Sequence, residues 1–138
     1  MIRRATINDV PHVVECGRAF HAYGTWSHVP LDEDAFGAFA HNVIAGAGAI
    51  FVTDDGMCGG VLVPAYFNPS FVMAAELFWW APSEGRALRE AYEAWAKSEG
   101  AAAVQFSAMT DEHLPGVSRL YRMGGFRQAE VAFVKEFR

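Results

Sequence analysis

Apolar residues recur along the chain with two different spacings, which predict an alternation of helices and strands. In residues 8–23 and 32–46 they recur every three or four positions, as on the buried side of a helix. The first helix is expected to begin at Thr6 or Asn8 and the second near Asp32, where side-chain oxygens accept hydrogen bonds from free backbone N–H groups. A short strand at about residues 1–5 is expected to precede them.

The spacing changes after residue 48. Residues 49–53 and 57–66 predict a hairpin around Asp55-Gly56, a pair that readily adopts the positive φ angles of tight turns. The later elements are expected to be a strand at 71–80, a helix at 83–100 stopped by Gly100, a strand at 102–108, a helix at 115–123 and a final strand at 126–137. The order β-α-α-β-β-β-α-β-α-β predicts one α/β domain over 1–138, with helices on both faces of a sheet.

Composition narrows the class of protein. The 138 residues are 52% hydrophobic and 20% charged, which is typical of a compact domain and not of a disordered chain. The formal net charge is −5 and no basic cluster is present, which argues against nucleic acid or an anionic membrane as partner. Cys16 and Cys58 stand in no metal-binding or disulfide pattern, and no secretion signal precedes them, so we expect a cytoplasmic protein without a metal. A zinc site of Cys16, His21 and His28 is formally possible but matches no known ligand spacing.

One segment favours anion binding. ELFWWAPSEGRAL (76–88) passes from an apolar strand through Pro82 and Gly85 directly into a helix. The N–H groups of residues 83–87 then lack helical acceptors and lie at the positive end of the helix dipole, where phosphate groups bind. A helix start that is merely capped is the alternative.

Three segments together resemble the GCN5-related N-acetyltransferase (GNAT) superfamily of CoA-dependent acyltransferases. They are IRRATINDVPHV (2–13), ELFWWAPSEGRAL (76–88) and RLYRMGGF (119–126), and the predicted order of elements matches as well. Gly85 and Ala87 match the end of the family's pyrophosphate loop, whereas Pro82 stands where the family has Gln or Arg. Leu114 stands where many members have Asn.

The resemblance implies a mixed, mostly antiparallel sheet whose fourth and fifth strands, 71–80 and 102–108, splay apart around acetyl-CoA. Backbone groups of one set of residues would hold the pantetheine arm and polarise the thioester: Phe78, Trp79 and Trp80. A second set at the helix start would hold the pyrophosphate: Ser83, Glu84, Gly85, Arg86 and Ala87. No metal is implied.

Two residues are candidates for proton transfer. Glu76 is the only acid between Asp55 and Glu84 and lies in the most apolar strand, where burial raises the pKa of a carboxyl group toward that of a useful general base. The alternative is a strand-end carboxylate that is exposed or paired with an arginine. By resemblance, Tyr121 would protonate the departing thiolate of CoA, and an ordinary core tyrosine is the alternative.

The acceptor would be a primary amine of a small molecule or peptide. Members of the family bind it mainly with the segment between the first two helices, which here contains His21, Tyr23, Trp26 and His28. Aromatic side chains beside Asp32 and Glu33 would suit a cationic amine. Alternatively, the acidic residues 32–34 simply cap the second helix.

The sequence therefore predicts an acetyl-CoA-dependent N-acetyltransferase that transfers the acyl group directly to the amine. The alternative is a non-catalytic GNAT-like binding domain with a degenerate CoA loop. A toxin-like transferase that acts on charged tRNA would need a basic face, and the net charge of −5 argues against it.

We also expect a homodimer, because the residues after Gly125 suffice for only one long strand or two very short ones and so leave a sheet edge unpaired. The exposed edge, or the surface rich in Trp and Phe, would form the contact. Light scattering at micromolar concentration should give a dimeric mass, and a monomeric mass would contradict the expectation.

Overall fold

The computed structural model describes residues 1–138, which form two compact units, Met1–Ser107 and Ala108–Arg138. The first unit contains β1 (Arg3–Arg4), a 3-10 turn (Ile7–Asp9), α1 (Val10–Tyr23), α2 (Glu33–Ala45), β2 (Gly48–Val52), β3 (Met57–Ala65), β4 (Asn68–Trp80), α3 (Gly85–Ser98) and β5 (Ala103–Gln105). The second contains α4 (Leu114–Met123). No helix is both long and apolar enough to cross a membrane. That the two units make one domain stays a prediction.

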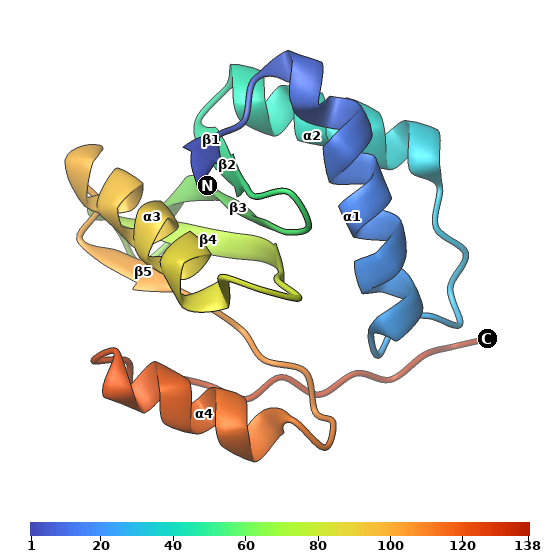
Figure 1. Ribbon diagram of the computed structural model, residues 1–138. Coiled ribbons are helices and arrows are strands. Elements are labelled where there is room, and N and C mark those ends of the chain that lie inside the picture. Colours follow the sequence, from blue (N-terminus) through green and yellow to red (C-terminus); the bar gives the residue numbers. More distant parts are fainter. The chain divides into compact units, whose positions relative to one another are not determined.

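The five strands form one sheet in the order β1-β2-β3-β4-β5 (Figure 1). Every neighbouring pair is antiparallel except β4 and β5, which run parallel. A mixed, mostly antiparallel sheet was the arrangement expected from the sequence, and it is confirmed.

Helix ends follow from local capping. The Ala35 N–H donates to the Asp32 carboxylate (2.9 Å), so the predicted start of α2 is confirmed. The first start differs from the prediction: a 3-10 turn begins after Thr6, whose N–H donates to the Asp9 carboxylate (2.8 Å), and α1 itself begins at Val10. At the other end of α3, Gly100 has a φ of 83°, the left-handed conformation that terminates a helix.

Two apolar cores flank the sheet, in agreement with the helices on both sides of it in Figure 1. The α1–α2 core contains Ala5, Val13, Cys16, Ala40, Val43, Ile50, Val52, Met57 and Phe78. The α3 core contains Ala49, Cys58, Ala74, Leu88, Tyr92, Trp95 and Ala96. Within β2, and likewise within β3, consecutive residues belong to different cores, because successive side chains of a strand point to opposite faces of the sheet.

The hairpin between β2 and β3 forms as predicted, but for a different reason. Gly56 is not among the residues with positive φ. Instead, a Cβ atom on Gly56 would lie 2.7 Å from the carbonyl oxygen of Trp80, so the turn needs glycine for close approach to the end of β4.

The final strand predicted at 126–137 is wrong, because these residues have no regular secondary structure and most are exposed. A strand requires a partner, and β5 spans only three residues and pairs with β4 alone. The alternating pattern of this segment therefore has no long strand edge in the sheet to pair with.

Gly60 of β3 allows the closest packing in the sheet. A Cβ atom on Gly60 would overlap both the Ala75 carbonyl oxygen and the Tyr92 hydroxyl. We expect Gly60→Ala to lower the free energy of unfolding by about 1–3 kcal/mol, as overpacked core substitutions do. Urea unfolding measures this change.

The matched control is Gly37→Ala in α2, where the nearest atom, Val14 Cγ2, is at an ordinary 3.5 Å. Because alanine favours the helix, this variant should be unchanged or more stable by up to about 1 kcal/mol. Equal effects of the two substitutions would contradict the packing of Gly60.

Candidate active site

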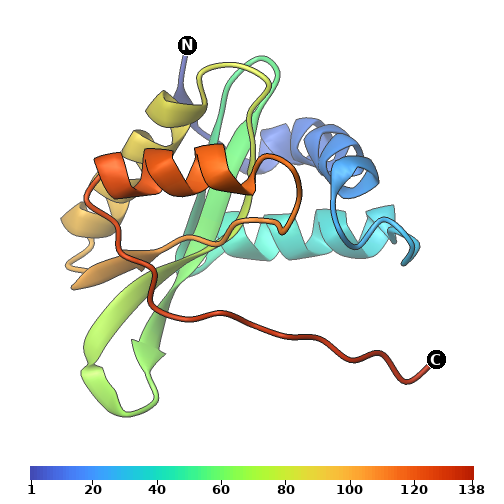
Figure 2. The same ribbon diagram turned by 90° about the horizontal axis from the view of Figure 1, so that it is seen from below.

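β4 is much longer than its parallel neighbour β5, and the ladder between the two strands ends midway along β4. Residues 73–75 of β4 pair with residues 103–105, and residues 76–80 pair with β3 alone. Figure 2 shows β3 and β4, in green, as a long hairpin. The backbone N–H and C=O groups of a strand point alternately to its two sides. Some of these groups in residues 76–80 therefore face away from β3 and have no partner strand.

A β-bulge at Leu77 changes the face that the end of β4 presents. Gly60 lies opposite Glu76, and the residue before Gly60 lies opposite Phe78, so Leu77 is the extra residue. Ala74 belongs to the α3 core, whereas Phe78 belongs to the α1–α2 core. In a regular strand the two would share a face. Glu76 precedes the bulge and therefore points to the α3 side.

The Glu76 carboxyl group lies where the β4–β5 ladder ends. Its Oε1 accepts hydrogen bonds from the Ser107 N–H (3.2 Å) and hydroxyl (3.4 Å), and it forms no ion pair with an arginine. Burial raises the pKa of Glu76 to about 7, although the two hydrogen bonds from Ser107 act in the opposite direction. Near neutral pH this carboxyl group is therefore able both to accept and to release a proton.

The start of α3 presents free backbone donors, as expected from the sequence. The first N–H to find an acceptor at the helix start belongs to Leu88, which donates to the Glu84 carbonyl (3.0 Å), so the N–H groups of residues 85–87 lack helical acceptors. The Trp79 indole N–H donates to the Gly85 carbonyl oxygen (3.2 Å) and ties the end of β4 to this helix start. These donors and the open part of β4 thus belong to one continuous segment.

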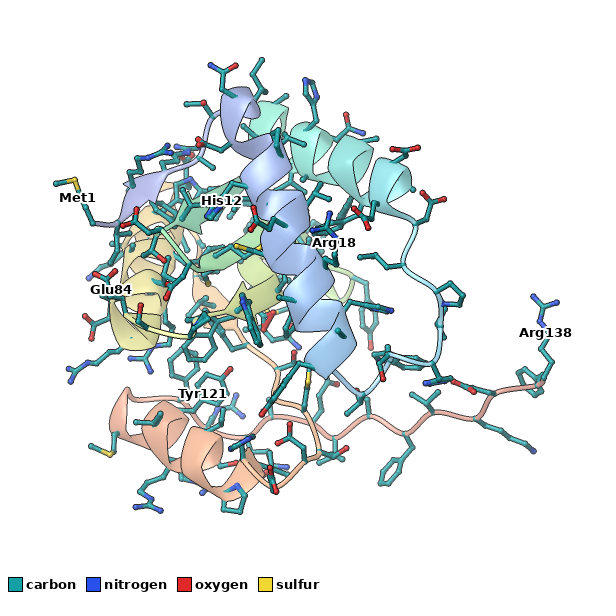
Figure 3. All side chains as sticks on the ribbon, turned by 45° about the vertical axis from the view of Figure 1, so that its right-hand side comes forward. Met1, His12, Arg18, Glu84, Tyr121 and Arg138 are labelled. Carbon is teal, nitrogen blue, oxygen red and sulfur yellow. The ribbon has the colours of Figure 1, made fainter.

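Acidic groups surround the same helix start. The Ser83 hydroxyl donates to both carboxylate oxygens of Asp55, at 3.0 and 2.9 Å. Glu84 has a left-handed φ of 56°, and its carboxylate lies 3.8 Å from the N-terminal ammonium of Met1 (Figure 3). Arg86 is the cation of the first helical turn, and it pairs with Glu90 at 2.7 Å.

The predicted acceptor residues fall into two groups. Tyr23, at the end of α1, lies 5.6 Å between ring centroids from Trp80 of β4. Trp26 stacks on His28 at 5.9 Å, and the His21 ring bonds to the Val29 carbonyl oxygen. The structure thus brings Tyr23 to the end of β4, through a Trp80 side chain that the sequence analysis had considered only for its backbone.

Both cysteine side chains are buried. Burial raises the pKa of Cys16 to about 11 and that of Cys58 further still, so both thiols stay protonated at neutral pH. Near Cys16 lies His12 of α1, at 3.7 Å, and not the histidines of the hypothetical zinc site (Figure 3). No group of three potential metal ligands occurs.

In the second unit, Tyr121 lies on α4, where Figure 3 labels it. The Phe126 N–H donates to the Tyr121 carbonyl (3.0 Å), the Gly125 N–H donates to the Arg122 carbonyl (3.1 Å), and Gly125 has a φ of 89°. The Tyr121 and Phe126 rings lie 5.3 Å apart. This is a Schellman helix stop with its usual apolar contact, so RLYRMGGF has a structural role of its own.

Two residues of this region were missed by the sequence analysis. Ser107 was included only within a predicted strand, and no sequence signal indicates that its N–H binds a side chain. Tyr92 fell only within the helix predicted at 83–100, yet its hydroxyl reaches Gly60. The Gly59-Gly60 pair within a strand was the available signal, because glycine there often marks close approach of another group.

Comparisons with known proteins support the fold. The sequence matches no family model and no curated protein. Among solved structures, a protein of Arthrobacter sp. FB24 to which acetyltransferase activity is ascribed has a TM-score of 0.75 and 19% identity, over 99% of this chain and 96% of that one. A Clostridium acetobutylicum protein predicted to be an acetyltransferase, in a structure with acetyl-CoA, has a TM-score of 0.71 and 11% identity, over 99% and 95%.

A third neighbour is an aminoglycoside acetyltransferase from an uncultured soil metagenomic sample, in complex with sisomicin. Its TM-score is 0.72 at 15% identity, over 100% of this chain and 96% of that one. This chain thus shares its fold, over nearly its full length, with solved structures of proteins for which acetyltransferase activity is ascribed or predicted. The resemblance stated from the sequence is confirmed at the level of the fold.

The raised pKa of Glu76 predicts a pH-dependent stability. Between pH 4.5 and about 7 the folded protein keeps a proton that the unfolded chain releases, so this group's contribution falls as pH rises, by at most about 3 kcal/mol. Glutamine mimics the protonated acid. Glu76→Gln should therefore match the parent protein near pH 4.5 and be more stable at pH 8, as measured by urea unfolding at each pH.

The control is Glu90→Gln on the surface of α3. Arg86 lowers the pKa of Glu90, so removing this carboxyl group should give no stabilisation at pH 8. If the difference in the free energy of unfolding between Glu76→Gln and the parent protein is the same at every pH in this range, the pKa of Glu76 is not raised in the folded protein.

Proposed function

We propose that this protein is an acetyl-CoA-dependent N-acetyltransferase that moves the acyl group directly to a primary amine. One observation supports the proposal above all: within an acetyltransferase fold, β4 loses its parallel partner at Glu76, and a partly buried carboxyl group with a pKa near 7 lies at that point. Such a group is suited to take the proton that an ammonium acceptor must lose.

The acyl donor would bind along the segment from β4 to α3. The N–H groups of residues 85–87 would hold the pyrophosphate, with Ser83, Glu84 and Arg86 beside it, because this is the positive end of the helix. The backbone of Phe78, Trp79 and Trp80 would hold the pantetheine arm between splayed β4 and β5. Its N–H groups would also stabilise the negative charge that develops on the thioester oxygen during transfer.

Two side chains would move protons. Glu76 would accept a proton from the amine, and Tyr121 would donate one to the leaving thiolate, since a free thiol titrates near roughly 8.5. The role of Tyr121 requires that both units, residues 1–138, act as one domain. Because Cys16 and Cys58 are held as thiols, the transfer proceeds without a covalent enzyme intermediate.

The acceptor would be a cationic small molecule or peptide amine. The first unit carries six Lys and Arg against twelve Asp and Glu, and so has a net charge of −6. His21, Tyr23, Trp26 and His28, together with Trp80, offer aromatic surface that suits an ammonium group. The sisomicin complex of the metagenomic neighbour is compatible with such an acceptor.

A non-catalytic binding domain is the second candidate. It is favoured by the absence of the family's Gln or Arg at Pro82 and by the Asp55 and Glu84 carboxylates near the helix start, which would repel phosphate. The two candidates differ in turnover, and binding alone cannot separate them.

The first arm of the test is thermal unfolding with acetyl-CoA, CoA and, as a phosphate control, ATP. Acetyl-CoA at about a hundred times its dissociation constant should add roughly 2.7 kcal/mol, which raises Tm by several degrees. A shift with acetyl-CoA but not with ATP is expected. No shift at millimolar acetyl-CoA would overturn the proposal.

The second arm measures CoA release with a panel of amines. Glu76→Gln should keep the thermal shift and lower kcat/KM by about 10²–10⁴-fold, and Tyr121→Phe, which retains the ring packing, should lower kcat by about 10²-fold. The control Glu99→Gln, exposed beyond the end of α3, should keep full activity. Binding without turnover across the panel would favour the binding domain.

A further inference from the structure

Tyr92 of α3 is a polar residue that the proposed chemistry does not use. Its side chain is fully buried in the α3 core, and its hydroxyl has no hydrogen-bond partner among the protein's atoms. Nearly all buried polar groups in proteins have a partner, so an orphaned hydroxyl calls for an explanation. Phenylalanine would fill the same space without the cost of burying the oxygen.

The hydroxyl lies beside Glu76. It occupies the place that a side chain on Gly60 would take, and Gly60 is the residue opposite Glu76 in the β3–β4 pair. Side chains of directly opposed residues lie on the same face of a sheet, close to one another. The Tyr92 hydroxyl and the Glu76 carboxyl group are therefore neighbours on the α3 side of the sheet.

Few other titratable groups lie near the Tyr92 hydroxyl and the Glu76 carboxyl group. β2, β3 and β5 contain no charged residue, and β3 contributes only the Cys58 thiol. From α3, the Arg89–Glu93 ion pair acts on Cys58, and from the residues after β5 Ser107 donates to Glu76. Burial, with the charges of Cys58 and Glu76, raises the pKa of Tyr92 and keeps it a phenol that donates.

We propose that Tyr92 is a positioning residue for Glu76: its hydroxyl donates a hydrogen bond that reaches the Glu76 carboxyl group through one water molecule. Ser107 donates to one oxygen of the Glu76 carboxyl group from the β5 side, and Tyr92 would donate to the same carboxyl group from α3, through that water molecule. The proton taken from the amine goes to Glu76, while Tyr92 keeps its own. This role in catalysis rests on the proposed function, but the hydrogen bond itself does not.

The test is a titration of the Glu76 carboxyl ¹³C resonance by NMR, identified by its loss in Glu76→Gln. Because a donor stabilises the carboxylate, Tyr92→Phe should raise the pKa of Glu76 by about one unit. In turnover, kcat/KM at pH 6 should then fall by up to about ten-fold, with little change at pH 9. The NMR measurement needs no acyl donor, so its failure is distinct from failure of the proposed function.

The matched control is Trp95→Phe, which removes the other buried polar atom without a partner, Nε1 of a residue on the same helix. The Trp95 ring lies under Arg4 and 5.4 Å from the Tyr92 ring, so this variant controls for repacking beside Tyr92. Because it leaves the Tyr92 hydroxyl in place, the pKa of Glu76 should not change. An unchanged pKa in folded Tyr92→Phe, or an equal shift in Trp95→Phe, would overturn the proposal.

A second variant covers the case in which Tyr92→Phe does not fold. Site-specific 3,5-difluorotyrosine at position 92 retains the hydroxyl and makes it a stronger donor, so it should lower the pKa of Glu76. No change, or a rise, would contradict the hydrogen bond.

Discussion

The divided pairing of β4 is the constraint on which the rest of the first unit depends. Antiparallel pairing with β3 along nearly its whole length holds β4 in place, so the strand can leave β5 after residue 75 without losing its position. The bulge at Leu77 then turns Phe78 into the opposite core. Gly59 and Gly60 make this possible, because side chains there would collide with the Ile50 and Tyr92 side chains on the two faces. The open backbone of the site is thus a consequence of how firmly the other edge is paired.

The same geometry determines the electrostatics of Glu76. Partial burial of the Glu76 carboxyl group at the end of the ladder raises its pKa, while the hydrogen bond that the Ser107 N–H donates to it lowers its pKa. The two effects oppose each other and leave the pKa near 7. A regular β4–β5 ladder would pair the Ser107 N–H with backbone, and the site would lose this balance.

Much of the fold was predictable because its signals are local. Asp32 and Gly100 mark helix ends through interactions within a few residues, and Asp55-Gly56 marks the hairpin even though Gly56 serves packing and not a positive φ. The bulge was not predictable, since 71–80 is apolar at every position except Glu76 and shows no alternation that a one-residue insertion could disturb. The final strand failed because alternation in sequence says nothing about whether a pairing edge exists.

The two catalytic candidates differ in what else explains them. Tyr121, Gly125 and Phe126 form a helix stop with an apolar contact, so their pattern would be expected in a protein with no activity at all. Glu76 has no such explanation, because an acid without a cation in a buried gap destabilises its ionised form, and a glutamine could accept the same hydrogen bonds from Ser107. Where a residue costs stability and a neutral side chain could accept the same hydrogen bonds, function is the better explanation for it. Glu76 in β4 therefore supports the proposed chemistry more strongly than the Tyr121 motif in α4 does.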